Sequence, residues 1–194
     1  VVPRPSNTET RRQQIVDGLL CVMAEKSYEK ATIASIARAA KLTPGVVHYH
    51  FNSKQEILLE LTRQLAEKLS RRYQSLTGDG SPQARLNAFI EARLATGPGS
   101  DPRAVACWVA VGTEASRQEE VGEIYRRVMG EQLEELSEIL APMLESQARR
   151  REAAVAILAA IEGCYQVATA APGLAPAGFG ARSVKAMAVG LIDA

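Results

Sequence analysis

The stretch from residue 32 to residue 54 constrains the fold of this chain more than any other. It reads TIASIARAAKLTPGVVHYHFNSK. Apolar residues at the helical spacing i, i+3, i+4, i+7 predict a short helix over residues 32–40 with one buried face, formed by Ile33, Ile36, Ala37 and Ala40. After a three-residue break, Thr43 can cap a second helix over residues 44–50. This pattern predicts a helix-turn-helix, whose second helix can enter a major groove of DNA.

The second of these helices has one face for the core and another for a partner. Val47 and Phe51 lie at i and i+4 and are expected to anchor it. The other positions are left to face DNA or flank it: Thr43, Gly45, Val46, His48, Tyr49 and His50. Gly45 costs a helix about 1 kcal/mol relative to alanine, and close approach of the backbone to DNA is a reason to carry it. For Tyr49, a partly buried position in the core is the alternative.

The ends of the first helix and the methyl groups of the second offer further contacts. Thr32 can cap the first helix, and the exposed N–H groups at a helix N-terminus favour an anion such as a phosphate. Val46 is a candidate for contact with a thymine methyl group.

The combined motif has its defining positions at Ala37, Ala40, Leu42, Thr43, Gly45, Tyr49, His50, Phe51, Ser53 and Lys54. It resembles the TetR family of bacterial transcription repressors over about residues 8–75, and the rest of the chain is similar to that family in size and helical order. The resemblance implies an all-helical dimer that binds operator DNA and lets go when a small molecule fills its C-terminal domain. It implies phosphate contacts at Thr32, Tyr49, His50 and Lys54, and positions near base edges at Thr43, Pro44, Gly45 and His48.

Capping patterns and helix breakers divide the rest of the chain. The pattern Ser6-x-x-Glu9 predicts a helix from about residue 7 to residue 27, whose Arg11 and Arg12 either meet a phosphate or are simply solvated. The pattern Ser53-x-x-Glu56 opens a long helix over residues 54–76. Later helices are expected over residues 82–97, 102–116, 118–144, 150–170 and from the end of a 172–180 loop to about 192.

No segment alternates with a period of two, so the predicted fold class is all-α with about nine helices. Its expected parts are a helix-turn-helix domain (1–53), a connecting helix (54–77) and a C-terminal ligand-binding and dimerisation domain (78–194). Residues 1–77 carry 12 Lys and Arg against 7 Asp and Glu, whereas residues 78–194 carry 11 against 15. A basic N-terminal part suits a polyanionic partner, and an acidic remainder adds no non-specific affinity for DNA.

Enzymatic and metal-binding chemistry finds little support in the residues. Both histidines, His48 and His50, lie two positions apart, so on a helix they point about 200° apart and cannot share a metal ion. No other histidine can activate a nucleophile. The cysteines are odd in number and distant in sequence, which favours a reducing compartment. No run of about 18 apolar residues or leader segment is found, so a cytoplasmic protein without metal, cofactor or membrane partner is expected.

Two expectations concern the C-terminal part. Small residues over 153–170, together with the final helix, favour a two-fold symmetric homodimer through the last two helices, with burial inside one monomer as the alternative. An apolar cavity between helices is the default ligand site. Its candidate lining residues, each of which could also be ordinary core, are Cys107, Trp108, Tyr125, Met129, Glu162 and Tyr165. The order Trp108, Glu114, Tyr125 resembles a TetR subgroup that includes a choline-responsive repressor.

The sequence is therefore interpreted as a ligand-responsive repressor that binds a palindromic operator as a homodimer and is released by a small-molecule effector. A constitutive architectural DNA-binding protein is the alternative within DNA binding, although an acidic C-terminal part of this size is more than DNA binding alone requires. A small helical enzyme is the alternative from another class.

Overall fold

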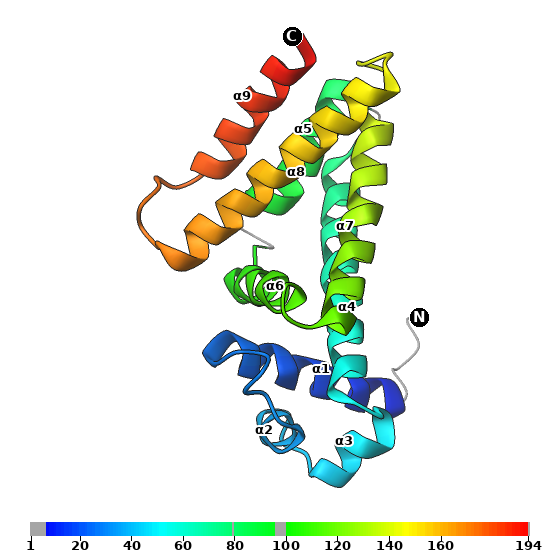
Figure 1. Ribbon diagram of the computed structural model, residues 1–194, viewed down its shortest axis with the longest axis vertical. Helices are drawn as coiled ribbons and strands as arrows, with labels where there is room; N and C mark the ends of the chain where they lie inside the picture. Colours follow the sequence, from blue (N-terminus) through cyan, green and yellow to red (C-terminus); the bar gives the residue numbers. More distant parts are fainter. Residues whose placement is uncertain (1–6, 79, 96–99, 194) are drawn as a thin grey trace. The chain divides into compact units, whose positions relative to one another are not determined.

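The structure is a computed structural model that describes residues 7–78, 80–95 and 100–193, and over these ranges every regular element is an α-helix (Figure 1). In chain order the helices are α1 (Asn7–Glu25), α2 (Ile33–Ala39), α3 (Pro44–His50), α4 (Lys54–Leu76), α5 (Pro82–Leu94), α6 (Pro102–Ala115), α7 (Glu119–Leu140), α8 (Gln147–Ala170) and α9 (Phe179–Asp193). The all-α fold class is confirmed, and the described ranges contain the nine helices expected.

Helix ends depart from the expected positions where local chemistry acts. The α7 helix ends at Leu140, four residues early, because Pro142 cannot continue it. The α8 helix begins at Gln147, three residues early, because the Ser146 side chain caps it by accepting a hydrogen bond from the Arg149 backbone N–H. The α5 helix ends at Leu94, with Ala95 as an extended C-cap, so its expected continuation to residue 97 is wrong. The expected cap at Ser6 lies outside the described residues.

The chain forms two compact units. The first comprises Val1–Leu65 and Pro102–Tyr125, and the second comprises Ala66–Asp101 and Arg126–Ala194. The division therefore falls within α4 and within α7. The first unit contains both α6 and the helix-turn-helix. The functional domains expected from the sequence have their boundaries at residues 53 and 77, and those domains stay a prediction.

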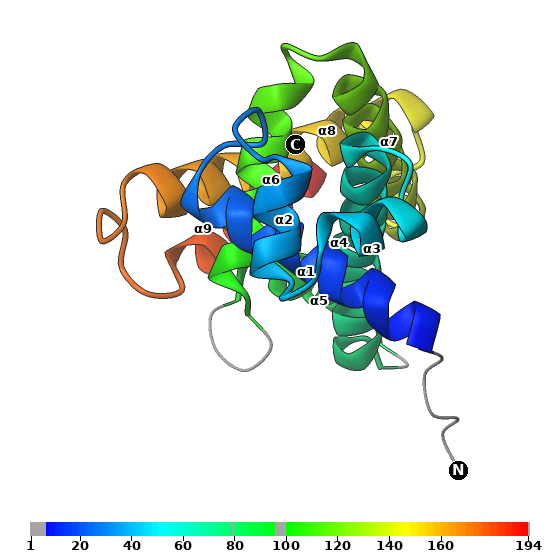
Figure 2. The same ribbon diagram turned by 90° about the horizontal axis from the view of Figure 1, so that it is seen from below.

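In the first unit, α1 packs against α2, α3 and α6 (Figures 1 and 2). Its buried residues include Ile15, Leu19, Val22 and Met23, which form an apolar stripe along the helix. Contact between α1 and α2 is close at Gly18, where an added Cβ would lie 2.8 Å from the Ile36 carbonyl oxygen. Only glycine allows this approach, which fixes α2 against α1 and so positions the helix-turn-helix.

In the second unit, α5, α8 and α9 pack against one another. Figure 1 shows α8 and α9 side by side, in orange and red. The α8 helix is the one described helix that is long and apolar enough to cross a membrane. The sequence was expected to contain no such segment, because charged residues interrupt its apolar runs. One such helix is weak support for a membrane span, because helices of soluble proteins can have the same composition.

Candidate DNA-binding site

The turn between α2 and α3 is closed by backbone hydrogen bonds. The Lys41 N–H bonds to the Arg38 carbonyl at 3.1 Å and the Leu42 N–H bonds to the Ala37 carbonyl at 2.9 Å. This is a Schellman motif, in which the residue just past the helix adopts a left-handed conformation. Lys41 does so, with φ of 57°. The motif sets the direction in which the chain enters α3.

The two helix caps behave differently. Thr32 caps α2 as expected, because its Oγ1 accepts from the Ser35 N–H at 3.1 Å while the Ser35 hydroxyl oxygen accepts from the Thr32 N–H at 2.9 Å. Thr43 occupies the N-cap position of α3, but its side chain makes no capping hydrogen bond. The expected side-chain cap at Thr43 is therefore wrong, although the helix starts at Pro44 as predicted.

The α3 helix presents most of its surface to solvent. Val47 and Phe51 are 0% and 1% exposed, which confirms them as its anchors. The Tyr49 side chain is 84% exposed, so the alternative of a partly buried core position is wrong. The other exposed candidates are Thr32, Thr43, Pro44, Gly45 and His48, and the partly exposed ones are Val46, His50 and Lys54. The Tyr49 and His50 rings meet edge to face with centroids 5.0 Å apart.

The packing of the chain does not require a glycine at position 45. A Cβ added there would meet only the Thr43 Oγ1, at 4.0 Å. Since alanine would stabilise α3 at this position, packing among the described residues gives no reason for Gly45. Close approach of DNA remains the candidate reason.

The Lys54 ammonium group contacts Tyr28, in the turn between α1 and α2. It donates to the Tyr28 carbonyl at 2.9 Å and lies 4.2 Å from the centroid of the Tyr28 ring. Burial lowers the pKa of Lys54, and nearby carboxylates, first that of Glu114, oppose the shift. Burial also raises the pKa of Tyr28 to about 12, with Glu120 and Glu114 adding to the effect. No local sequence pattern predicts this cluster, because its members come from the α1–α2 turn, α4, α6 and α7.

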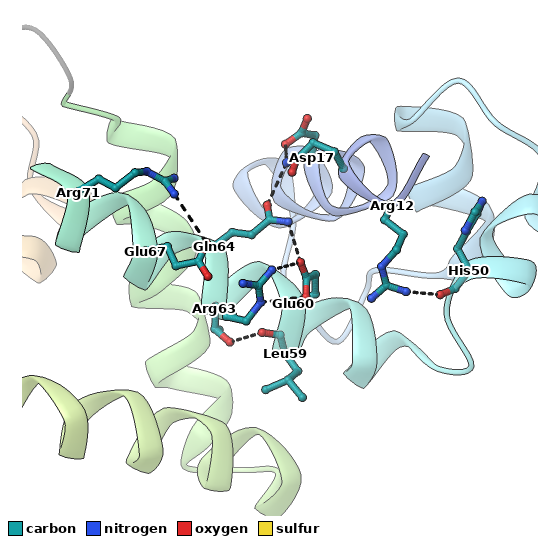
Figure 3. A network of polar contacts seen from close by, with 11 residues as sticks. Arg12, Asp17, His50, Leu59, Glu60, Arg63, Gln64, Glu67 and Arg71 are labelled. Carbon is teal, nitrogen blue, oxygen red and sulfur yellow. Dashed lines mark hydrogen bonds and ion pairs between the residues drawn. The ribbon is translucent and has the colours of Figure 1, made fainter. Parts of the chain in front are cut away.

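Arg11 and Arg12 of α1 both have hydrogen-bond partners within the protein, where the sequence left phosphate contact and solvation as alternatives. Arg11 donates to the Gln14 side chain at 2.9 Å on the same helix. Arg12 donates to the carbonyl oxygen of His50, at the end of α3, at 2.7 Å (Figure 3). Its carbon Cζ lies 4.1 Å from the Phe51 ring centroid.

The six expected ligand-lining residues divide between the units. In the first unit the Trp108 and Tyr125 rings stack, with centroids 4.9 Å apart and an interplanar angle of 25°. Cys107 is fully buried, with its sulfur 3.9 Å from that of Met23. Glu114 is another buried residue of α6, at 4% exposure, and its carboxylate accepts from the Gln118 side chain at 2.8 Å.

In the second unit, Tyr165 is buried and its hydroxyl donates to the Arg93 carbonyl at 3.2 Å. Burial raises the Tyr165 pKa. The Met129 sulfur accepts a long contact of 4.0 Å from Gln132, and Glu162 is partly exposed. These three residues belong to a different unit from Trp108, so the proposed set is not assembled within either unit.

Arg93 of the second unit was missed by the sequence analysis. It is 6% exposed, with its guanidinium over the Phe89 ring at 3.3 Å and hydrogen bonds to the Gln132 and Glu135 side chains at 3.0 and 3.4 Å. Burial lowers its pKa, whereas Glu135 acts to raise it. A single arginine in a helix of mixed polar and apolar residues carries no pattern that separates a buried position from an exposed one.

Two family models match the chain. Residues 15–61 match the bacterial regulatory proteins of the tetR family, and residues 82–193 match the C-terminal part of BetI-type transcriptional repressors. The second match alone covers more than half of the chain.

Curated relatives agree with these matches. The HTH-type transcriptional regulator BetI of Rhizobium meliloti is 31% identical over 121 residues, 62% of this chain and 59% of that protein, so this match spans less than two thirds of the relative. BetI of Agrobacterium fabrum is 28% identical over 181 residues, 91% of this chain and 86% of that protein. The HTH-type nicotine-responsive transcriptional repressor HdnoR of Paenarthrobacter nicotinovorans is 27% identical over 166 residues, 81% of this chain and 83% of that protein.

Solved structures share the fold. A transcriptional regulator from Rhodococcus sp. has a TM-score of 0.82 at 22% identity, covering 94% of this chain and 96% of that one. A putative regulator from Saccharomonospora viridis in complex with choline has a TM-score of 0.71 at 22% identity, covering 94% of this chain and 95% of that one.

Proposed function

The chain belongs to the TetR family of bacterial regulatory proteins, with a BetI-type C-terminal part, and we propose that it binds a palindromic operator as a homodimer and is released by a small-molecule effector. It is a transcriptional repressor with a DNA-binding helix-turn-helix. Such a protein acts where the DNA is, which in a bacterium is the cytoplasm.

The observation that carries the operator proposal is the exposure of α3. The α3 helix has seven residues, and its largest exposed side chain is Tyr49, at 84% exposure. This aromatic ring lacks the stabilisation that burial in the core would give it. Contact with DNA explains both this exposure and the glycine at position 45. The proposed phosphate contacts, which follow from the resemblance, are Tyr49, His50, Lys54 and Thr32. The proposed positions near base edges are Thr43, Pro44, Gly45 and His48, and Val46 is a proposed thymine-methyl contact.

Homodimerisation is supported by the apolar surface of α8, α9 and the loop between them. Its exposed large side chains are Val155, Val167, Leu174, Phe179, Met187 and Val189. Exposed apolar side chains concentrated on two neighbouring helices are typical of a protein interface. Two copies related by a two-fold axis would cover this surface and present two recognition helices about 34–36 Å apart.

The dimer can be tested by sedimentation of the full-length protein. Met187→Glu combined with Val155→Glu is expected to convert the dimer to a monomer, because two carboxylates would be buried in each interface. Leu76→Glu is the matched control, since Leu76 is 44% exposed on α4, outside this surface. A double variant that sediments as the wild type does would contradict the assignment.

The proposed effector is a small organic cation. Choline is bound in one solved neighbour, and nicotine, an amine, names one relative. In this chain the Trp108 and Tyr125 rings offer aromatic faces of the kind that attract cations. They stack on each other here, so a cation between them would have to separate α6 from the start of α7. Because α6 also packs against α1, such a shift would reach the helix-turn-helix.

One experiment tests operator and effector in turn. The full-length protein is used to select duplexes from a random-sequence pool, which are expected to contain two inverted half-sites with centres 10–10.5 bp or a multiple apart. Choline and nicotine are then titrated against the bound duplex, with the neutral choline isostere 3,3-dimethylbutanol as control. The fluorescence of Trp108, the sole tryptophan, reports ligand contact directly. Enrichment of no sequence would contradict operator binding, and release by neither cation would contradict the proposed effector class.

A further inference from the structure

The recognition helix has few internal reasons to hold one orientation. The α3 helix is seven residues long, and its N-cap residue Thr43 makes no side-chain hydrogen bond. Val47 is its one buried residue. Helices this short are unstable in isolation, because the cost of nucleation is spread over few hydrogen bonds. Its placement must therefore come from neighbouring elements.

Arg12 of α1 supplies a contact at the C-terminal end of α3. Its guanidinium donates to the His50 carbonyl at 2.7 Å and lies over the Phe51 ring, with Cζ 4.1 Å from the centroid (Figure 3). The last carbonyls of a helix lack partners within the helix, and a cation there also meets the negative end of the helix dipole. One side chain thus satisfies the last carbonyl of α3 and covers the ring that anchors it.

The end of α3 that Arg12 holds carries the exposed aromatic pair. The Tyr49 and His50 rings meet at an interplanar angle of 88°, so the direction of the Tyr49 ring depends on where His50 lies. The backbone carbonyl of His50 is the group that Arg12 grips. A shift of this carbonyl would therefore displace both rings relative to the DNA.

The part of α1 that carries Arg12 is fixed by its packing and by a hydrogen bond to α4. Ile15 and Val16, one turn along α1, are fully buried. The neighbouring residue Gln13 donates to the Gln64 side chain of α4 at 2.9 Å. Consecutive residues of α1 thus contact α3 and α4, the helices that carry three of the four proposed phosphate contacts, Tyr49, His50 and Lys54.

We propose that Arg12 is a positioning residue for operator reading: its guanidinium fixes the C-terminal end of α3 and thereby the placement of Tyr49 and His50. This inference rests on the proposed operator binding. It assigns Arg12 a role inside the protein, in place of contact with a DNA phosphate.

The two roles differ in what they do to binding. Loss of a phosphate contact would weaken binding to every duplex alike and reduce the slope of log affinity against log salt by about 0.9. Loss of positioning would instead weaken binding to the preferred sequence most, because the phosphate contacts of Tyr49 and His50 fix the register in which α3 meets the base edges, whereas non-specific affinity depends mainly on charge. The salt slope would stay unchanged.

The test uses three variants of the full-length protein: Arg12→Met, Arg12→Lys and Arg11→Met. Arg11→Met is the matched control, since it removes the same charge from the adjacent position, while the hydrogen bond of Arg11 within the described part of the chain goes to Gln14 of its own helix. The probes are the duplex that the wild type enriches from the random pool and a shuffled duplex of equal length. Affinities are measured across a salt series, together with hydrogen exchange of the amides of residues 44–51.

The expected result is a loss of about tenfold in affinity of Arg12→Met for the enriched duplex, comparable to one lost base contact, with affinity for the shuffled duplex changed less than about twofold. Arg12→Lys should recover part of the loss, because its ammonium can still donate to the His50 carbonyl. Hydrogen exchange in residues 44–51 should accelerate in Arg12→Met and not in Arg11→Met.

Three results would overturn the assignment. Equal losses on both duplexes with a reduced salt slope would make Arg12 a phosphate contact. Equal behaviour of the Arg11→Met and Arg12→Met proteins would reduce the effect to net charge. Unchanged duplex affinity and unchanged hydrogen exchange in Arg12→Met would show that Arg12 has no positioning role. If the wild type enriches no duplex, it is the proposed operator binding that fails, while the exchange comparison still tests the hold on α3.

Discussion

The ammonium group of Lys54 donates to the backbone carbonyl of Tyr28 at 2.9 Å and lies against that residue's ring. The first residue of α4 is thereby tied to the turn that precedes α2. The resemblance assigns the same ammonium group to a DNA phosphate. An ammonium has three donors, so contact with Tyr28 leaves capacity for a phosphate, and the protein contact would hold the charge in place beforehand.

Lys54→Met should therefore lower both stability and DNA affinity. We expect the free energy of unfolding to fall by about 1 kcal/mol, because the Tyr28 carbonyl loses a charge-assisted hydrogen bond. Affinity should fall on all duplexes, with the salt slope reduced by about 0.9. Denaturant titration and binding across a salt series measure the two effects. An unchanged salt slope would show that Lys54 serves only the internal contact.

Gly45→Ala should have effects of opposite sign on stability and on binding. Alanine is the better helix former by up to about 1 kcal/mol, and the added Cβ has open space. The melting temperature should therefore hold or rise. Binding to the enriched duplex should weaken, because the methyl group would occupy the space in which the backbone approaches DNA. Calorimetry and anisotropy titration on one preparation separate the effects. Undiminished affinity would mean that Gly45 does not lie against DNA.

Much of the first unit could be predicted from the sequence, because local signals and tertiary packing agree there. The structure matches the expected start of α3 at Pro44 and its anchors Val47 and Phe51. It also buries three of the four residues expected on the apolar face of α2, namely Ile36, Ala37 and Ala40. The motif positions are close together in sequence, so spacing alone places them on common faces.

The contacts that fix the site could not be predicted in the same way. The bond from Arg12 to His50 joins residues 38 positions apart, and Lys54 reaches Tyr28 across 26. No periodicity links such pairs, and a basic residue in a first helical turn reads equally well as solvated. The missing side-chain bond at Thr43 depends on a rotamer, which residue type does not determine.

Lys41→Gly should stabilise the turn of the helix-turn-helix. Lys41 has φ of 57°, and this left-handed conformation costs a residue with a Cβ roughly 1 kcal/mol relative to glycine. The larger conformational entropy of glycine in the unfolded chain offsets part of the gain. We expect the melting temperature to rise by up to about 2–4 °C at fixed protein concentration. A lower melting temperature would mean that the lysine side chain contributes more than its backbone conformation costs.

Tyr73 and Tyr165 are buried to nearly the same extent, at 8% and 7% exposure, yet removal of their hydroxyl groups should have opposite effects. The Tyr73 hydroxyl has no hydrogen-bond partner among the described residues, so its desolvation is uncompensated. Tyr73→Phe should leave the free energy of unfolding unchanged or raise it by up to about 1 kcal/mol.

The Tyr165 hydroxyl, in contrast, donates to the Arg93 carbonyl at 3.2 Å. Tyr165→Phe should therefore lower the free energy of unfolding by about 1 kcal/mol, since it leaves a carbonyl acceptor without this donor. Both variants are compared by denaturant unfolding at equal protein concentration, because dimerisation makes apparent stability depend on it. A larger loss from Tyr73→Phe than from Tyr165→Phe would mean that the Tyr73 hydroxyl holds a partner, such as a bound water molecule or a ligand, that its protein neighbours do not supply.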